Sequence, residues 1–361
     1  MPHTLITDTD ALARAAERWA SSPFLALDTE FVRIDTYYPR LCLIQVRDHQ
    51  RTDLLDMTAI ADIKPLLDAL DAPAQIKLFH AASQDLEILT QLHGSAPKPL
   101  FDTQIAATLL GVGDQVGYGK LVQQQLNITL DKSLSRTDWA RRPLRQDELA
   151  YAADDVEYLA QIYPALQAEL AARGRLEWLA EDCARMAEPS QYHTDPADAW
   201  QRLRGLGRMS AREQTVAAAL AQWRETLAQT HNRPRKWILD DDAIYRLAER
   251  QPHTLKALEL LQVVPSKTQL KHGEALLDII REAQNQPETR WAADDELSDS
   301  DKSQLKKLQA IVADRARALE LPPGFIAPRA DLIRIVHHQA NARVLSGWRR
   351  TQCGEALLAA L

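Results

Sequence analysis

The chain has 361 residues, 45% of them hydrophobic and 26% charged, which is ordinary for a soluble globular protein of two or three domains. The net charge of -7 argues at first against a nucleic-acid partner. The charge is unevenly distributed, because residues 1–190 hold 18 Lys/Arg and 28 Asp/Glu whereas residues 191–361 hold 25 Lys/Arg and 22 Asp/Glu. An acidic half that suits divalent cations therefore precedes a mildly basic half. Three distant cysteines exclude a disulfide framework, and because no signal peptide or membrane span is found we expect a cytoplasmic protein without a membrane partner.

Strand-like runs come early in the chain and helical patterns follow them. Short apolar runs predict strands at residues 24–32, 41–47, 51–55 and 75–79, and DIKPLLDAL between the last two has helical spacing. From about residue 83 helical patterns dominate, and beyond Pro189 no convincing strand is found. This order predicts a domain with a mixed α/β sheet, followed by helices.

Two acids interrupt the otherwise apolar first of these runs, LALDTEFV. Asp28 and Glu30 are two positions apart, so on a strand they project from the same face. Two carboxylates about 4 Å apart repel by roughly 4 kcal/mol at an effective dielectric near 20, whereas a shared cation turns repulsion into attraction. The pair therefore indicates either a metal site or an edge strand whose acids meet solvent or pair with Arg33.

Further acids follow at positions that could reach the same place. Asp85 in HAASQDLEIL lies in the first turns of a helix that follows a strand, where a negative charge is also favourable without a metal. In DELAYAADDVEYLAQIY, Tyr151 and Asp155 are four residues apart and share a helix face, whereas Asp154 lies about 100° away. Each of these signals alone also fits an ordinary solvated acid.

Taken together, the D-x-E pair, the later acid and Y-x-x-x-D resemble the three exonuclease motifs of the DEDD superfamily in its tyrosine variant. HAASQDLEIL, PLFDTQIAATLLG, TLDKSLSRTDWARRPL and LAYAADDVEYL are similar, in that order and spacing, to ribonuclease D. GRMSAREQTVAAALAQW and the residues after it resemble the helical HRDC module of that family, and ARVLSGWRRTQCGEALLAAL resembles its second, more divergent HRDC module.

The resemblance implies a ribonuclease H-like exonuclease domain with a mixed sheet, followed by two all-α HRDC-like domains. The boundaries that we expect are 1–190 for the nuclease, 191–207 for a linker, 208–288 for the first HRDC domain and 295–361 for the second.

The resemblance also implies a two-metal site that holds Mg²⁺ or Mn²⁺. The metal ligands that it implies are Asp28, Glu30, Asp85 and Asp155. Tyr151 would be a fifth catalytic residue that orients the attacking water, because a phenol with a pKa near 10 is a poor general base.

A basic loop at DKSLSRTDWARRP resembles a family segment close to the scissile end. Guanidinium groups clamp phosphate and an indole can stack on a base, so Lys132, Trp139 and Arg142 are candidate RNA contacts. The alternative is a solvated loop with Trp139 in the core.

Other motifs have plainer explanations. GVGDQVGYGKL does not match a Walker A loop, which would need Gly in place of Asp114, so we expect a flexible connection between helices. Asp102 in FDTQIAA is better explained as a helix N-cap than as a metal ligand, and His80 as a core residue or a support for a ligand.

The later half places basic groups near aromatic ones. We expect Trp223 and Trp237 in the core, whereas Arg233, Arg235 and Lys236 either contact RNA phosphates or form a solvated basic turn.

The function that the resemblance implies is a metal-dependent 3′-to-5′ exoribonuclease that trims RNA 3′ ends, with tRNA precursors as substrates and nucleoside 5′-monophosphates as products. Two alternatives stay open: the same chemistry on DNA, and a catalytically silent RNA-binding module. The chain has no helicase motor, which favours RNA, and it keeps all five motif residues, which disfavours a silent module. No obligatory protein partner is evident.

Overall fold

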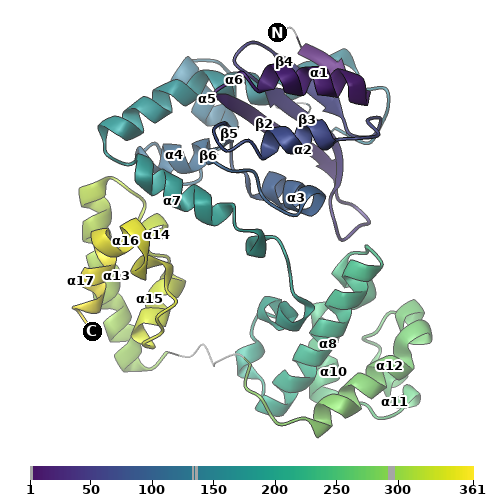
Figure 1. The fold of residues 1–361 in the computed structure, drawn as a ribbon. Helices are drawn as coiled ribbons and strands as arrows, with labels where there is room; N and C mark the ends of the chain where they lie inside the picture. The colour runs from purple at the N-terminus through teal and green to yellow at the C-terminus, as the bar shows by residue number, and fades with distance from the viewer. Residues whose placement is uncertain (1–2, 132–133, 135–136, 292–296) are drawn as a thin grey trace. The chain divides into compact units, whose positions relative to one another are not determined.

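The structure is a computed structural model that describes residues 3–131, 134, 137–291 and 297–361. It divides into two compact units, whose parts can be followed by colour in Figure 1. Unit 1 comprises Met1–Val32, Leu41–Tyr192 and Leu297–Leu361, and unit 2 comprises Arg33–Arg40 and His193–Glu296.

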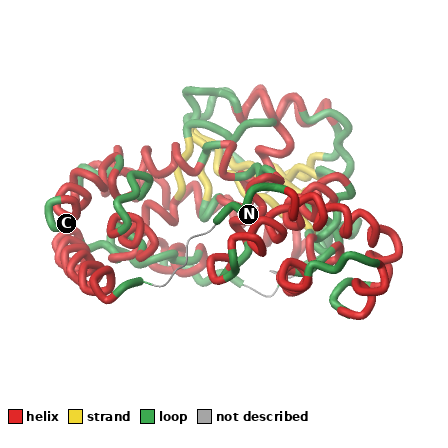
Figure 2. The backbone as a smooth tube through the Cα atoms, turned by 90° about the horizontal axis from the view of Figure 1, so that it is seen from below, coloured by secondary structure: helices red, strands yellow, loops and turns green. Residues whose placement is uncertain are grey.

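A six-stranded mixed sheet in the order β1-β4-β3-β2-β5-β6 is the frame of unit 1. The strands are β1 (His3–Ile6), β2 (Phe24–Val32), β3 (Arg40–Arg47), β4 (Thr52–Asp56), β5 (Ile76–Phe79) and β6 (Leu100–Asp102). The pairs β1/β4, β2/β5 and β5/β6 are parallel, whereas β3/β4 is antiparallel. Figure 2 shows these strands in yellow, and the rest of the described chain is helix and loop.

This architecture confirms the predicted fold class. The four strands expected from the sequence are β2 to β5, each within one residue at either end, whereas β1 and β6 were missed. β6 has only three residues, and two of the four residues of β1, His3 and Thr4, are polar, so neither strand shows a clear apolar run.

Seven α-helices precede residue 193 in the described chain. They are α1 (Thr9–Trp19), α2 (Lys64–Leu70), α3 (Ser83–His93), α4 (Thr103–Leu109), α5 (Tyr118–Leu126), α6 (Gln146–Ala172) and α7 (Leu176–Met186). Asp8 starts α1 by accepting the Ala11 N–H, and Asp102 is the N-cap of α4, as its sequence context predicted. The long helix α6 packs against β2 and β4, which brings its acids over the strand that carries Asp28 and Glu30.

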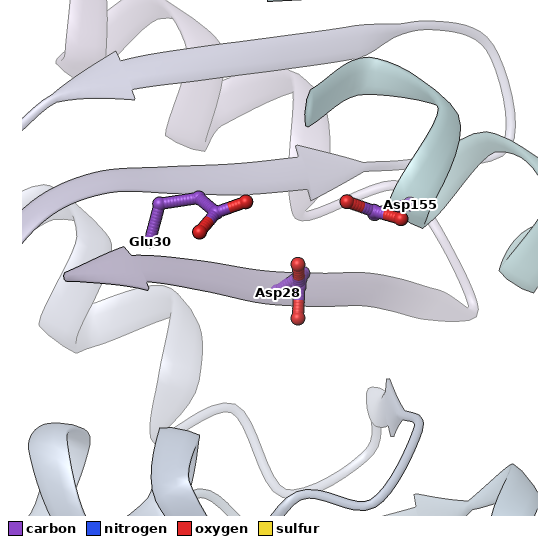
Figure 3. Close-up of side chains that lie close together, drawn as sticks. All are labelled: Asp28, Glu30 and Asp155. Atoms are coloured by element: carbon purple, nitrogen blue, oxygen red, sulfur yellow. The ribbon is translucent and has the colours of Figure 1, made fainter. Parts of the chain in front are cut away.

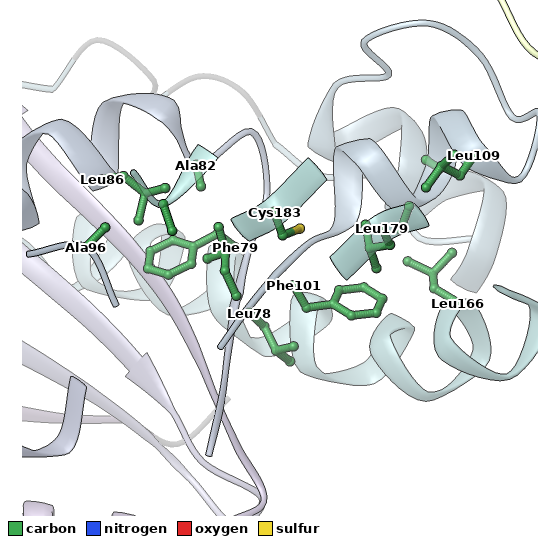
Figure 4. Close-up of a cluster of buried hydrophobic side chains, with 14 of the residues drawn as sticks. Leu78, Phe79, Ala82, Leu86, Ala96, Phe101, Leu109, Leu166, Leu179 and Cys183 are labelled. Atoms are coloured by element: carbon green, nitrogen blue, oxygen red, sulfur yellow. The ribbon is translucent and has the colours of Figure 1, made fainter. Parts of the chain in front are cut away.

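The main core of unit 1 joins the sheet to these helices. Figure 4 shows Phe79 of β5, Phe101 of β6, Leu166 of α6 and Leu179 of α7 within one cluster of buried side chains. Cys183 lies in the same cluster, and all three cysteines of the chain are buried and free of disulfides. The buried apolar area stabilises the unit by about 25 cal/mol per Å².

The C-terminal segment belongs to this same unit. Its helices are α13 (Asp299–Leu319), α14 (Pro323–Ile326), α15 (Arg329–Val336), α16 (Gly347–Arg349) and α17 (Glu355–Leu358). Trp348 stacks on Trp178 of α7 with ring centroids 4.5 Å apart, and the buried Arg349 binds both carboxylate oxygens of Asp182 at 2.5 and 2.9 Å. We expected a separate domain at 295–361, but the described part of that segment shares one apolar core with the nuclease.

Unit 2 is a helical bundle around its own core. Its helices are α8 (Ala211–Thr230), α9 (Arg235–Ile238), α10 (Asp241–Arg250), α11 (Leu255–Leu261) and α12 (Ser266–Asn285). Ser210 and Glu213 form a capping box that starts α8. Ala199, Leu203 and Leu206 are buried in this core, so part of the expected linker 191–207 is packed structure.

The two tryptophans of this unit differ from each other. Trp223 packs against the core, as expected, whereas Trp237 is 51% exposed and its predicted burial was wrong. Trp237 lies on α9, whose four residues are too few to form a buried helix face.

A loop from the nuclease sequence, Arg33–Arg40, also folds as part of unit 2. Arg235 donates to the Tyr37 hydroxyl at 2.7 Å and lies over the Tyr37 ring, 4.5 Å from its centroid. Both side chains bind the buried carboxylate of Glu225, and Arg235 reaches its two oxygens at 2.5 and 2.6 Å. The side-chain oxygen of Asn232 accepts the backbone N–H groups of Tyr37 and Tyr38 at 3.0 and 2.9 Å.

Among the described residues, none of the helices combines the length and the apolar character that a bilayer crossing requires.

Candidate active site

Three of the predicted acids meet over the centre of the sheet. Asp28 and Glu30 project from the same face of β2, and Asp155 reaches them from α6 (Figure 3). Each of the three can place a carboxylate oxygen within 4.8 Å of the other two. Residues 127 positions apart therefore form one acidic site, because α6 packs across β2.

Asp85 stands next to this group and is held from the other side of the strand. It lies in the first turn of α3, it is 7% exposed, and its carboxylate accepts a hydrogen bond of 2.5 Å from the Thr29 hydroxyl. Its charge raises the pKa of both Asp28 and Glu30, so the fourth acid belongs to the same electrostatic environment.

Burial disfavours the ionised form of all four acids, and the charges of neighbouring carboxylates add to this effect. Burial, with the charges of Asp85 and Asp155, raises the pKa of Asp28 well above its usual range. The pKa of Glu30 rises to about 8 for the same reasons, and burial raises the pKa values of Asp85 and Asp155 to about 7. Closely spaced carboxylates that are costly to ionise are the arrangement that a hard divalent cation stabilises.

Tyr151 lies one helical turn before Asp155 on α6, as the spacing predicted. Burial and the neighbouring charges of Asp155, Glu30 and Asp28 raise its pKa above the usual value for a phenol. The hydroxyl therefore stays protonated near neutral pH and can donate a hydrogen bond toward the acids, but it cannot act as a base.

The sequence did not reveal two further residues at this site. Tyr118, which begins α5, donates a hydrogen bond from its hydroxyl to the backbone oxygen of Asp154 at 2.9 Å. Burial raises the pKa of Tyr118, and the charges of Asp155 and Asp28 raise it further. Thr29 holds Asp85, as described above. The only signal for Tyr118 in the sequence is an aromatic residue among glycines, a pattern that predicts a flexible connection rather than the start of α5.

Two residues whose role was open now have partners. His80 Nδ1 lies 3.0 Å from the Thr103 hydroxyl, and burial lowers the pKa of the imidazole, so it is a neutral supporting side chain behind the site. The Asp102 carboxylate accepts backbone N–H groups at the start of α4 and before α3, which fits a capping role.

In the basic loop before α6, Trp139 and Arg142 make their contacts within the protein. Trp139 is only 3% exposed and packs 6.3 Å from the Tyr151 ring, which agrees with the core alternative. Arg142 donates all five of its N–H groups to protein acceptors, two of them to Asp56 at 2.6 and 2.7 Å, so no donor remains for a phosphate in this arrangement. Lys132 lies outside the described residues.

The basic turn of unit 2 is divided between two roles. Arg233 donates to the backbone oxygen of Asp35 at 3.1 Å, and Arg235 binds Glu225 and Tyr37, so both hold the loop Arg33–Arg40. Lys236 is exposed. Contact of these three residues with RNA stays a prediction.

Comparison with known proteins agrees with this geometry. A family model described as 3′-5′ exonuclease matches residues 3–171, and an HRDC domain model matches residues 199–280. The chain is 37% identical to the ribonuclease D of Pseudomonas paraeruginosa over 364 residues, which cover 99% of this chain and 96% of that one. It is 39% identical to the ribonuclease D of Sphingobium indicum over 370 residues, which cover 98% and 92% of the two chains.

Solved structures show the same relationship. The crystal structure of Escherichia coli RNase D, described as an exoribonuclease involved in structured RNA processing, matches with a TM-score of 0.92 and 32% identity, covering 100% of this chain and 99% of that one. The catalytic core of RRP6 from Trypanosoma brucei, at 21% identity and a TM-score of 0.62 over 79% of this chain and 80% of that one, shares the fold.

The mixed sheet, the buried acids and the matching exonuclease model define the protein as a 3′-to-5′ exonuclease, a hydrolase with a helical HRDC region. Such an acidic cluster in this class of enzyme indicates a divalent metal ion. The similarity along the whole chain is more specific: the chain belongs to the ribonuclease D family of 3′-to-5′ exoribonucleases.

Proposed function

We propose that this protein trims the 3′ ends of RNA, tRNA precursors among them, in the cytoplasm and releases nucleoside 5′-monophosphates. The cluster of Asp28, Glu30 and Asp155, with Asp85 beside it, is the observation that carries this proposal. The similarity to an E. coli enzyme of structured RNA processing supports RNA as the substrate.

Two Mg²⁺ or Mn²⁺ ions fit the residues at this site. The four side chains offer only carboxylate oxygens, which these hard cations prefer. Asp28, Glu30, Asp85 and Asp155 would hold them, and their raised pKa values show how costly it is to ionise the four acids without a cation. When bound, such ions supply positive charge that lowers the pKa of water and neutralises the charge on the phosphate oxygens.

The side chains around the acids have separate tasks. The protonated Tyr151 hydroxyl orients the attacking water as a hydrogen-bond donor. The Thr29 hydroxyl fixes one carboxylate oxygen of Asp85, so that the other oxygen is free to bind a cation. Tyr118 binds the backbone of α6 one residue before Asp155 and thereby fixes the helical turn that carries this acid.

The experiment that tests this proposal is a digestion of 5′-labelled RNA with MgCl₂, in which we expect stepwise shortening from the 3′ end and mononucleotide products. Asp155→Asn removes one carboxylate and is expected to lower the rate at least about 100-fold. Asp10→Asn is the matched control, since it removes an exposed carboxylate of α1 that lies outside the cluster, and it is expected to keep activity. Full activity of Asp155→Asn, or products other than mononucleotides, would contradict the proposal.

Substrate class is tested by digesting matched RNA and DNA oligonucleotides at equal salt. We expect faster shortening of RNA, and equal or faster shortening of DNA would overturn the RNA assignment. A second comparison, between a tRNA precursor with a 3′ extension and an unstructured RNA of equal length, is expected to show trimming of the precursor that stops near the folded acceptor stem. Failure to shorten the precursor would remove tRNA maturation from the proposal.

A further inference from the structure

Unit 1 contains a cavity of about 430 Å³ that is separate from the acidic cluster. Its walls come from the start of α3, from α7 and the residues after it, and from the C-terminal segment. The residues that matter for its chemistry are Ser83, Arg185, Gln191, Tyr192, Phe325 and Arg343. It therefore combines cationic, amide, hydroxyl and aromatic groups.

Arginines outnumber acids among the residues that line this cavity. Asp182 is the one acid in its wall, and it is neutralised by Arg343 at 2.7 Å and by Arg349 at 2.5 Å. Asp331, the nearest acid of α15, is likewise paired with Arg334 at 2.9 Å. Within the lining, two arginines thus face one acid, whereas Asp85, Glu87 and Asp102 act on the cavity through Tyr192.

Two of these guanidinium groups have N–H donors to spare. Arg185 makes no hydrogen bond or ion pair with any described residue, and burial together with the positive charge of Arg343 lowers its pKa. The Nε atom of Arg343 is buried and has no partner among the described atoms. A planar guanidinium with open donors binds phosphate well, and a second one nearby adds to that attraction.

The position of the cavity relates it to the nuclease site. Ser83 in its wall is two residues before Asp85 on α3, and the charge of Asp85 contributes to the raised pKa of Tyr192. The rings of Tyr192 and Phe325 offer apolar faces of the kind on which bases stack. One wall of the cavity is therefore the helical turn that carries Asp85.

We propose that this cavity binds a phosphate group of a nucleotide, with Arg185 and Arg343 as its cationic contacts. The phosphate belongs either to the RNA chain or to a free nucleoside 5′-monophosphate. The RNA source rests on the proposed function, whereas phosphate binding does not.

The test measures binding by the full-length protein in EDTA, so that no hydrolysis takes place. Arg185→Gln removes the charge at the cavity, and Arg14→Gln is the matched control because Arg14 is an exposed arginine on α1, away from the cavity. The probes are a 5′-fluorescein oligoribonucleotide, followed by anisotropy, and AMP, followed by calorimetry.

We expect Arg185→Gln to weaken RNA binding by about 3- to 10-fold and to reduce the slope of log affinity against log salt by about one, with Arg14→Gln at wild-type values. Weaker AMP binding with unchanged RNA binding would support the free nucleotide as the source. Unchanged binding of both probes would overturn the proposal.

Loss of folding is separated from loss of binding by two controls. Arg185 has no hydrogen bond to lose, so Arg185→Gln is expected to keep the wild-type melting temperature. Arg185→Lys keeps the charge but not the fork of donors, and is expected to fall between Arg185→Gln and wild type. These experiments measure binding and not catalysis, so their outcome is independent of the exonuclease assay.

Discussion

The catalytic role that we propose for Asp28 comes at the expense of the stability of the cation-free protein. Its buried carboxylate lies among three other acids, which raise its pKa after the effect of burial. We expect Asp28→Asn to raise the melting temperature in EDTA by a few degrees, equivalent to about 1–2 kcal/mol, and to lose most of the increase that MnCl₂ gives the wild type. Differential scanning calorimetry with and without metal measures both effects.

Asp10→Asn serves as the control here too, because it lies outside the cluster and should keep the wild-type response to MnCl₂. An Asp28→Asn protein that the cation stabilises as strongly as the wild type would show that this carboxylate does not bind metal.

Tyr151 tests whether the phenol orients or deprotonates the water. Its pKa is raised above the usual value, so Tyr151→Phe is expected to lower kcat by about 10- to 100-fold with little change in KM and no change in the shape of the pH–rate profile below about pH 9. If the profile of the wild type has a limb that Tyr151→Phe lacks, the phenol titrates during catalysis and the donor role is wrong.

Lys77, a buried lysine outside the acidic site, is expected to make the free energy of unfolding depend on pH. It is fully buried on β5, its ammonium group donates to the backbone oxygens of Ala72 and Lys98 at 2.5 and 3.2 Å, and burial lowers its pKa from 10.5 to about 8. Between pH 8 and about 10.5 the unfolded chain binds more protons at this group than the native protein, so this group makes stability increase with pH in that window.

We therefore expect Lys77→Met to be more stable than wild type at pH 7, by about 1–3 kcal/mol, and to lose that advantage by about pH 10. Urea unfolding of both proteins at the two pH values measures the difference. A difference that does not change with pH would mean that Lys77 is charged in the native protein throughout this range.

Among single residues, the sequence predicted those whose partners are only a few positions away along the chain. Asp28 and Glu30 share a strand and Tyr151 and Asp155 share a helix, so periodicity alone paired them. Thr29 points away from Asp28 and meets Asp85 only because α3 packs near β2, and Tyr118 meets α6 through the fold. Neither contact has a signature in local spacing.

Among the elements, the loop Arg33–Arg40 depends on one buried ionic group. Glu225 of α8 is 1% exposed, and its contacts with Arg235 and Tyr37 keep its pKa below the ordinary value in spite of burial. Arg235→Ala leaves this carboxylate without its cation and is expected to destabilise unit 2 by about 3–5 kcal/mol. Chemical denaturation of the full-length protein measures the loss.

The double variant Arg235→Ala with Glu225→Gln removes the charge that was left unpaired, and we expect it to recover at least half of that loss. No recovery would mean that Arg235 stabilises the unit through its contact with the Tyr37 ring rather than through Glu225.

The predictability of the strands followed both their length and their apolar content. β2 and β3, with nine and eight residues, were found almost to the residue, whereas the three residues of β6 were not. Helix α9 is an example in which the sequence misled us. An aromatic residue on a four-residue helix does not indicate burial, and Trp237 is exposed.

For the whole molecule, the shared core of unit 1 makes the nuclease depend on the C-terminal segment. Trp348 is 6% exposed and stacks on Trp178 of α7. We expect Trp348→Ala to lower the temperature at which exonuclease activity is lost, consistent with about 3–5 kcal/mol for a buried aromatic residue. Trp237→Ala, at an exposed tryptophan, is the matched control and should inactivate like wild type.

Equal thermal inactivation of Trp348→Ala and Trp237→Ala would show that the C-terminal segment unfolds independently of the nuclease. The sequence could not predict this shared core, because amphipathic helices show that they bury an apolar face but not which partner covers it.

The loop Arg33–Arg40 also constrains how such a protein can change during evolution. The chain passes between the two units four times, and Tyr37 and Glu225, which bind each other, are 188 positions apart. Exchange of residues 193–296 for the matching stretch of a relative would bring in a new helical module but leave the old loop behind. Such a chimera is expected to need the donor's loop as well, so we expect the two stretches to be inherited as a pair although a long nuclease sequence separates them.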